Sequence, residues 1–332
     1  MPRSKIAILY VGGSIGMKVN QKTGRIEPIE SLNEIHRFLP ELQREVALKF
    51  FSLANVGSSE ITPNNWVEIA LKIGQIYDDF EGFVVVHGAN TMSYTAAALS
   101  FALQGLSKPV ILTGAIHPIN DIAGDGRMNL IYAIRAAQLD IAEVCVVMGP
   151  RVLRGNRAKK VDQSLFRTFD TLTCAALAEF NMEVHLAGHR IVRRKRTLKC
   201  RPDFDPNVVL LSMHPGMSDR FLDAVLASEP HGIVLRTYGP GMIPVHLYDW
   251  LRTVTKQGIP VLLTSQALRG KVDLHCYHKQ LTLERLGVIS GANMTFECAT
   301  VKLMWAIRQT HNSKHLRDLL AKSLAGEMDE WR

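Results

Sequence analysis

Short apolar runs alternate with helical segments up to about residue 140, and this alternation limits the fold more than any other feature of the sequence. Five runs have the length and composition of buried strands: 6–11, 49–53, 82–86, 108–115 and 144–148. Helices are predicted between them over 62–79, 91–106 and 128–138. Such alternation forms βαβ units around a mainly parallel sheet with helices on both faces. We therefore predict an α/β fold.

The second half of the chain repeats this pattern after a change in composition. Residues 151–190 are polar and basic without a clear period, so we expect a β-rich excursion there. Further strands are predicted near 208–211, 232–235 and 260–264, and helices near 219–228, 245–257, 280–286 and 295–309. A chain of 332 residues is long enough for two domains. We predict an N-terminal α/β domain over 1–190, a basic linker over 191–206, and a smaller C-terminal α/β domain over 207–332.

The composition argues against several classes of protein and of site. No apolar run approaches the roughly 18–20 residues that cross a bilayer, and the first residues lead directly into a predicted strand, so we expect a cytoplasmic protein with no membrane partner. The five cysteines are scattered and form no C-x-x-C pair, which argues against disulfides and a cysteine zinc site. The histidines show no metal-ligand spacing, and no nucleotide-binding glycine motif is present. We expect no metal and no cofactor.

A basic run between residues 190 and 199 carries much of the net charge. It holds six lysines and arginines, whereas the whole chain has a net charge of +8, so the remainder is nearly balanced. No aromatic residue is interleaved with these charges, unlike in single-stranded nucleic-acid sites. We interpret the run as a surface loop or linker and expect no nucleic-acid partner, with a polyanion site as the alternative.

Hydroxyl and amide side chains collect where three of the predicted strands end. The first strand ends in a double glycine followed by Ser14, a turn that allows a ligand to approach the backbone closely. The second leads to Ser58 and Ser59, and the third to Asn90 and Thr91. Each of them alone is typical of a turn. Because ligands of open α/β sheets bind beyond the carboxyl ends of strands, their coincidence predicts a pocket for a small polar ligand with carboxylate or amide groups.

A cationic loop follows the fifth predicted strand and contains Lys159 and Lys160. Either lysine could activate a neighbouring hydroxyl or relay a proton if its pKa were depressed, whereas a solvated basic loop is the simpler interpretation. His87 precedes the turn after the third strand, and we expect it to be a buried hydrogen-bonding residue.

Seven blocks of sequence resemble those of the bacterial-type L-asparaginases, particularly the cytoplasmic type I enzymes. In chain order they are 12–17 (GGSIGM), 57–63 (GSSEITP), 79–92 (DFEGFVVVHGANTM), 108–114 (KPVILTG), 154–157 (RGNR), 236–239 (RTYG) and 287–295 (GVISGANMT). The resemblance covers almost the whole chain. It implies a two-domain α/β fold with a larger N-terminal domain, and a homodimer or dimer of dimers with active sites near the subunit contacts.

The resemblance also implies roles for individual residues. In this family a threonine after the first strand attacks a side-chain amide and forms an acyl-enzyme that water then resolves. Ser14 stands at the position of that nucleophile, Ser58 and Ser59 stand at the substrate loop, and Lys160 stands at the catalytic lysine.

Four positions of the predicted site depart from the family's pattern. Ser14 keeps the hydroxyl of the threonine but lacks the methyl group that restricts its rotamer. Ala89 and Asn90 replace the threonine and the aspartate of His-Gly-Thr-Asp-Thr, so a hydroxyl and a carboxylate are missing together. Arg25 lies nearest to the place where many members carry a tyrosine.

Two functions remain open from the sequence. The first is an amidohydrolase of altered or weak activity, with Ser14 as nucleophile, acting on an asparagine-like or substituted amide. A substrate without a free α-ammonium would suit Asn90, and Arg25 could meet an anionic group. The second is a catalytically inactive homologue that binds an amino-acid-like ligand as a sensor or subunit. In both, the partner is a small amino-acid-like molecule.

Overall fold

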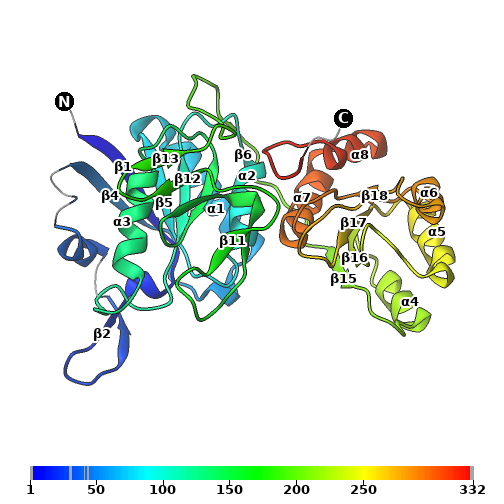
Figure 1. The fold of residues 1–332 in the computed structure, drawn as a ribbon, viewed down its shortest axis with the longest axis horizontal. Coiled ribbons are helices and arrows are strands. Elements are labelled where there is room, and N and C mark those ends of the chain that lie inside the picture. Colours follow the sequence, from blue (N-terminus) through cyan, green and yellow to red (C-terminus); the bar gives the residue numbers. More distant parts are fainter. Residues whose placement is uncertain (1–2, 30–31, 41, 43–44, 330–332) are drawn as a thin grey trace. The chain divides into compact units, whose positions relative to one another are not determined.

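The chain forms two compact units, Met1–Pro202 and Asp203–Arg332, in a computed structural model (Figure 1). The structure describes residues 3–29, 32–40, 42 and 45–329. Each unit is built around its own sheet, and helices pack against that sheet. The predicted α/β class, with two domains and mainly parallel sheets, is confirmed.

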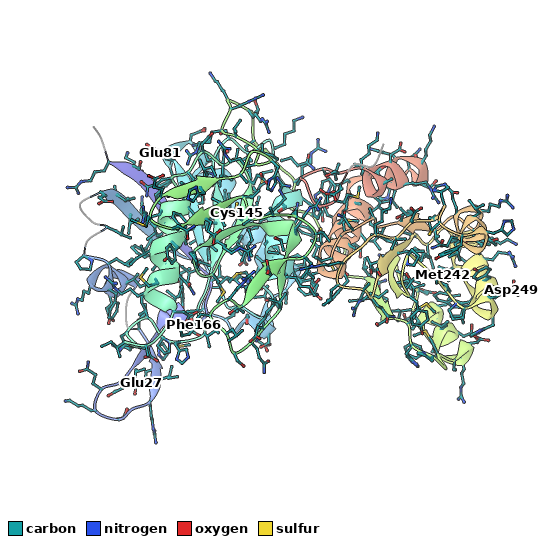
Figure 2. The ribbon with its side chains drawn as sticks, in the orientation of Figure 1. Glu27, Glu81, Cys145, Phe166, Met242 and Asp249 are labelled. Carbon is teal, nitrogen blue, oxygen red and sulfur yellow. The ribbon has the colours of Figure 1, made fainter. Side chains whose placement is uncertain are left out.

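The first unit contains an eight-stranded sheet in the order β13-β12-β9-β8-β7-β5-β1-β4. The five strands predicted before residue 150 form one continuous parallel part of it: β4 (Val46–Ser52), β1 (Ser4–Tyr10), β5 (Gly82–Val86), β7 (Val110–Thr113) and β8 (Val144–Val147). Every residue of β5 is buried, as expected for a central strand of a parallel sheet covered on both faces. Figure 2 shows Cys145 of β8 within this sheet.

Three helices connect these strands: α1 (Pro63–Gln75), α2 (Met92–Ala102) and α3 (Gly126–Ala136). α1 begins as predicted, with Thr62 at the N-cap and Pro63 in the first turn. α3 contributes Leu130 and Ile134 to a core cluster with Ile8 of β1. Because successive strand residues face opposite sides, the residues next to Ile8 turn to the other face. The parallel sheet is therefore buried on both sides, and its strand ends are held in fixed positions.

Short antiparallel strands form the predicted excursion after β8. They are β9 (Arg151–Arg154), β10 (Ala158–Lys160), β11 (Phe169–Thr171), β12 (Ala178–Phe180) and β13 (Val184–Leu186). β9, β12 and β13 extend the large sheet, whereas β10 and β11 form a separate hairpin in which Lys160 pairs with Phe169. Two other small pairings were not predicted, β2 (Met17–Val19) with β3 (Ile26–Pro28) and β6 (Leu103–Gln104) with β14 (Lys199–Cys200).

The basic run divides into anchored and exposed residues. The Arg193 guanidinium donates to the backbone oxygens of Leu139 at 2.7 Å, Ala137 at 2.9 Å and Glu81 at 3.1 Å. Arg190 donates to the carboxylate of Asp140 at 3.1 Å. The next three basic residues, 194–196, are exposed. The run is thus tied to the first unit by its arginines and continues in that unit as far as Pro202.

Arg193→Ala should destabilise the first unit. The guanidinium is half-buried, and its removal leaves three carbonyl oxygens without this donor. We expect a loss of about 2 kcal/mol in the free energy of unfolding, which lowers the thermal midpoint by about 4–8 °C. Circular dichroism during heating measures the thermal midpoint. Arg194→Ala is the matched control because that side chain is exposed. Equal midpoints for the two variants would contradict this account.

The second unit has a parallel four-stranded sheet in the order β15-β16-β17-β18. Its strands are β15 (Val208–Ser212), β16 (Gly232–Thr237), β17 (Val261–Ser265) and β18 (Ile289–Ser290). Its helices are α4 (Asp219–Ala227), α5 (Tyr248–Lys256), α6 (His278–Arg285), α7 (Phe296–Gln309) and α8 (Ser313–Ala321). β18 and α8 were not predicted. Across the ranges that the structure describes, no helix is both long and apolar enough to cross a membrane.

Candidate active site

Ser14 lies four residues beyond the end of β1 (Ser4–Tyr10), at the start of a short 3₁₀ helix, η1 (Ser14–Gly16). Gly12 and Gly13 turn the chain there with φ values of 143° and 94°, which other residues rarely adopt. A Cβ atom on Gly12 would lie 2.1 Å from the Val56 carbonyl oxygen, and one on Gly13 would lie 2.8 Å from the Gly88 nitrogen. The double glycine is therefore required both by the turn and by the close approach of the loops after β4 and β5.

His87 fixes the start of the loop after β5. Its ring Nδ1 is 2.7 Å from the Gly88 carbonyl oxygen, and its Nε2 is 3.0 Å from Thr95 Oγ1. Trp66 Nε1 donates to the same hydroxyl at 3.1 Å. A carbonyl oxygen only accepts, so Nδ1 carries the proton and Nε2 accepts from Thr95. The prediction of a buried hydrogen-bonding histidine is confirmed.

Burial lowers the pKa of His87 to about 4, although its bond to the Gly88 backbone acts in the opposite direction. Above pH 6.5 the ring is neutral in the folded and the unfolded chain, so it adds no pH dependence. Between about 6.5 and about 4 only the unfolded chain takes up the proton, and stability falls as the pH falls. Each pH unit in this interval lowers the free energy of unfolding by at most about 1.4 kcal/mol, so the whole interval lowers it by about 3 kcal/mol.

Urea unfolding at pH 7.5 and at pH 4.5 tests this role of His87. The free energy of unfolding should fall more between the two pH values for the wild type than for His87→Gln. An equal fall in the free energy of unfolding for the two proteins would contradict this role of His87.

The loop after β4, which carries Ser58 and Ser59 and is called the Ser58 loop, is hydrogen-bonded to the loop after β5. Thr91 Oγ1 donates to the Ser58 carbonyl oxygen at 2.6 Å, and the Asn90 backbone nitrogen donates to Ser58 Oγ at 3.4 Å. Ser59 Oγ donates to the carboxylate of Glu60 at 3.2 Å. The second and third strand ends thus form one surface, as the sequence predicted.

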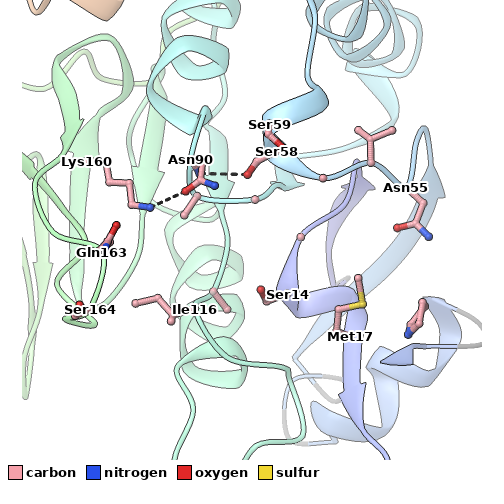
Figure 3. Close-up of a pocket in the computed structure, with 17 residues that line it drawn as sticks. Ser14, Met17, Asn55, Ser58, Ser59, Asn90, Ile116, Lys160, Gln163 and Ser164 are labelled. Atoms are coloured by element: carbon pink, nitrogen blue, oxygen red, sulfur yellow. Dashed lines mark hydrogen bonds between the residues drawn. The ribbon is translucent and has the colours of Figure 1, made fainter. Parts of the chain in front are cut away.

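Lys160 approaches this surface from the β10–β11 hairpin. Its Nζ donates to Asn90 Oδ1 at 2.7 Å. In the view of Figure 3, Lys160 and Ser14 lie on opposite sides of the site, with Asn90 between them. No hydrogen bond joins the Ser14 hydroxyl to any other residue that the structure describes. The lysine is thus directed at Asn90, and the hydroxyl of Ser14 is available to a ligand.

A third wall of the site comes from the loop after β7. The Asp125 carboxylate accepts the backbone N–H groups of Ile116 at 3.0 Å and His117 at 3.0 Å. Asn129 Nδ2 donates to Asp125 at 2.9 Å and to the Gly114 carbonyl oxygen at 2.9 Å. These bonds hold the loop in place, so Ile116 forms a fixed apolar part of the wall.

These walls enclose an open pocket with a volume of about 790 Å³. Six of the seven predicted site residues line it: Ser14, Ser58, Ser59, Ala89, Asn90 and Lys160. The seventh, Arg25, is exposed next to β3 and does not line the pocket. Further residues that were not predicted from the sequence also line the pocket, among them Met17, Asn55, Gln163 and Ser164. Asn55 stands next to the Ser58 loop in the sequence, whereas only the β10–β11 pairing reveals the role of residues 163 and 164.

The polar side chains that line the pocket belong to four serines, three amides and one lysine. Lys160 is its only ionisable side chain among the described lining residues, and no carboxylate lines it there. Within the described ranges, no group of three or more His, Cys, Asp or Glu residues is placed to hold a metal ion. The site can therefore present hydroxyls, amides and one ammonium group to a small ligand.

Both halves of the chain match known families. Residues 5–192 match the family described as "Asparaginase, N-terminal", and residues 207–320 match "Glutaminase/Asparaginase C-terminal domain". L-asparaginase 1 of Escherichia coli K12 is 32% identical over 99% of this chain and 99% of its own length. A glutamyl-tRNA(Gln) amidotransferase polypeptide of Pyrococcus furiosus is 33% identical over 97% of this chain and 76% of its own length.

Solved structures agree with these matches. The thermostable L-asparaginase of Thermococcus kodakarensis is 31% identical with a TM-score of 0.91, and the alignment covers 98% of this chain and all of that one. L-asparaginase I of Vibrio cholerae is also 31% identical with a TM-score of 0.91, over 99% of this chain and all of that one. By sequence and by fold, the chain belongs to the asparaginase family.

Proposed function

We propose that this protein is an asparaginase-type amidohydrolase in which Ser14 is the nucleophile. The observation that carries the proposal is the position of the Ser14 hydroxyl, which follows the first strand, lines the pocket and has no hydrogen-bond partner among the described residues. Ser58 and Ser59 offer hydroxyls to a substrate carboxylate from the facing loop. The relatives' names, asparaginase and amidotransferase, both refer to amide groups.

The reaction has two steps. Ser14 Oγ attacks the carbonyl carbon of the substrate's amide, its proton passes to the amide nitrogen, the C–N bond breaks, and ammonia leaves. Water then attacks the resulting ester, the ester C–O bond breaks, and a proton returns to Ser14 Oγ as the carboxylic acid is released. The substrate is an asparagine-like or substituted amide. Activity is altered or weak, because Ala89 provides no hydroxyl next to the nucleophile and Lys160 is bound to Asn90.

Ammonia release tests the proposal. The purified protein is incubated with L-asparagine, L-glutamine, N-acetyl-L-asparagine and a peptide that contains internal asparagine. We expect release from at least one of them at a rate well above that of Ser14→Ala protein. If none of the four amides is hydrolysed faster than by Ser14→Ala protein, the proposal is wrong.

A second candidate is a binding protein without catalysis. The bond from Lys160 to Asn90, together with the alanine at position 89, favours it because neither lysine nor alanine then helps to move a proton from Ser14. In this case the pocket holds an amino-acid-like ligand as a sensor or subunit. Saturable binding without any ammonia release would support it over the hydrolase.

We further propose that the protein is cytoplasmic and forms a homodimer or a dimer of dimers. Support comes from the family resemblance. The chain has a mass of 37.0 kDa, so light scattering after size exclusion should give twice or four times that mass. A species at the monomer mass across the concentration range would argue against it.

A further inference from the structure

The charges around the pocket suggest which substrates it accepts, and this inference rests on the proposed function. A free amino acid carries an α-ammonium group, which proteins usually meet with a carboxylate. Of the described residues that line the pocket, none is an aspartate or a glutamate, and Lys160 adds a positive charge. An α-ammonium bound here would face a like charge, and the nearby Glu60 carboxylate, which accepts from Ser59 Oγ at 3.2 Å, does not line the pocket.

The bond between Lys160 and Asn90 also decides what Asn90 offers to a ligand. An ammonium group has only donors, so it takes the oxygen end of the Asn90 amide, at 2.7 Å. The Nδ2 end must then face away from Lys160, and in Figure 3 it lies on the side of Ser58. The Asn90 side chain therefore presents donors to the pocket, where an aspartate would present an acceptor.

These two features give the pocket a consistent chemistry. Lys160 Nζ and Asn90 Nδ2 are donors, and the hydroxyl of Ser58 can donate as well, whereas Ser59 donates its hydroxyl proton to Glu60. A ligand that fits is rich in acceptors and carries no positive charge at its α-nitrogen. An acylated α-nitrogen meets this requirement, because it has lost its charge and brings a carbonyl oxygen.

We propose that the pocket selects side-chain amides whose α-nitrogen is acylated, as in N-acyl asparagine or an asparagine within a peptide, and that Lys160 recognises their acceptor groups as a fixed cation held by Asn90. Lys160 is then a binding and specificity residue. Like charges a few ångströms apart disfavour the free amino acid by roughly 10- to 100-fold in affinity.

Titration calorimetry with two reaction products tests the selectivity without any need for turnover. N-acetyl-L-aspartate and L-aspartate differ in the acyl group and in the charge of the nitrogen. With the wild-type protein we expect N-acetyl-L-aspartate to bind at least about 10-fold more tightly. Equal affinity, tighter binding of L-aspartate, or no measurable binding of either compound would overturn the proposal.

Substitutions of similar shape at the two positions assign the effect to Lys160 and Asn90. Lys160→Met removes the charge and should weaken N-acetyl-L-aspartate binding by about 10-fold or more, whereas Lys160→Arg should retain most of the affinity. Asn90→Asp adds a carboxylate of the same size and should reverse the preference in favour of L-aspartate. Circular dichroism shows whether each variant is folded. A folded Lys160→Met protein with wild-type affinity, or a folded Asn90→Asp protein with unchanged preference, would overturn the proposal.

The same set of compounds separates this inference from the proposed function. If N-acetyl-L-aspartate binds preferentially but N-acetyl-L-asparagine releases no ammonia, the selectivity is correct and the hydrolase is wrong. If ammonia is released and L-asparagine is preferred over its N-acetyl form in kcat/KM, the hydrolase is correct and the selectivity is wrong.

Discussion

Replacing Ser14 by alanine should abolish ammonia release from the best substrate, with a loss in kcat of roughly 10³- to 10⁶-fold. The substitution removes the oxygen that forms the ester in the proposed reaction, and alanine is smaller, so it fits the turn after Gly13 without a clash. Because the substrate's carboxylate would be held by the facing loop, the affinity for N-acetyl-L-aspartate should change by less than about 3-fold. Steady-state kinetics and calorimetry measure these two effects separately.

Two further variants show whether the hydroxyl itself is responsible. Ser4→Ala removes a hydroxyl from the opposite end of the same strand, where it bonds Glu81 on the surface, and should leave kcat unchanged. Ser14→Thr keeps the hydroxyl and adds a methyl group, so activity should remain measurable. Addition of hydroxylamine should capture the acyl group of the ester as a hydroxamate. If Ser14→Ala protein keeps activity within about 10-fold of the wild type, another group must be the nucleophile.

The position of this site could be predicted from the sequence because parallel strands bring their carboxyl ends to one edge of a sheet. Ser14, Ser58 and Asn90 are far apart in sequence, yet their strands β1, β4 and β5 are neighbours. The double glycine is explained only by the structure. At these positions a Cβ would collide with the backbone of Val56 or Gly88, a contact between loops that no local pattern reveals.

The failures of prediction have a common physical cause, which is contact between distant segments. The resemblance places Arg25 at the site, nearest to the position where many members of the family carry a tyrosine, but in the structure it is exposed in the β2–β3 hairpin and does not line the pocket. Residues 163 and 164 line the pocket only because β10 pairs with β11. Arg193 looked like one charge in a solvated run, and its guanidinium binds three backbone oxygens that lie far from it in sequence.

Lys302 is a further example, because a charged residue in the middle of a helix would normally be assigned to the surface. The side chains of Lys302 in α7 and Glu327 are both 0% exposed, and their charged groups lie 2.7 Å apart. Lys302 Nζ also donates to the carbonyl oxygens of Leu320 at 3.0 Å and Lys322 at 2.6 Å. These carbonyls are at the end of α8, where a helix leaves its acceptors unpaired. A positive charge is favourable there.

Glu327 is equally well satisfied on its own side. Its carboxylate accepts the backbone N–H groups of Leu324 at 3.0 Å and Ala325 at 2.8 Å. The pair therefore joins α7, the end of α8 and the turn that follows it. Without one partner, the other would be a buried charge with only neutral hydrogen bonds to offset its lost hydration.

Lys302→Met should consequently destabilise the second unit by about 3–5 kcal/mol, because it leaves the Glu327 carboxylate buried and removes the donor to the end of α8. Hydrogen–deuterium exchange, read by mass spectrometry on peptides from α7 and α8, should show faster exchange there. Lys314→Met is the matched control on the exposed face of α8 and should change the opening free energy by less than about 0.5 kcal/mol.

A double substitution distinguishes the charge pair from simple packing. Lys302→Met with Glu327→Gln removes both charges, while the glutamine oxygen can still accept the N–H groups of the turn. If the buried carboxylate causes the loss, the double variant should be more stable than Lys302→Met alone, with a coupling of about 1–3 kcal/mol. If the costs of the two substitutions simply add, the pair has no energetic coupling and the loss comes from packing and from the open end of α8.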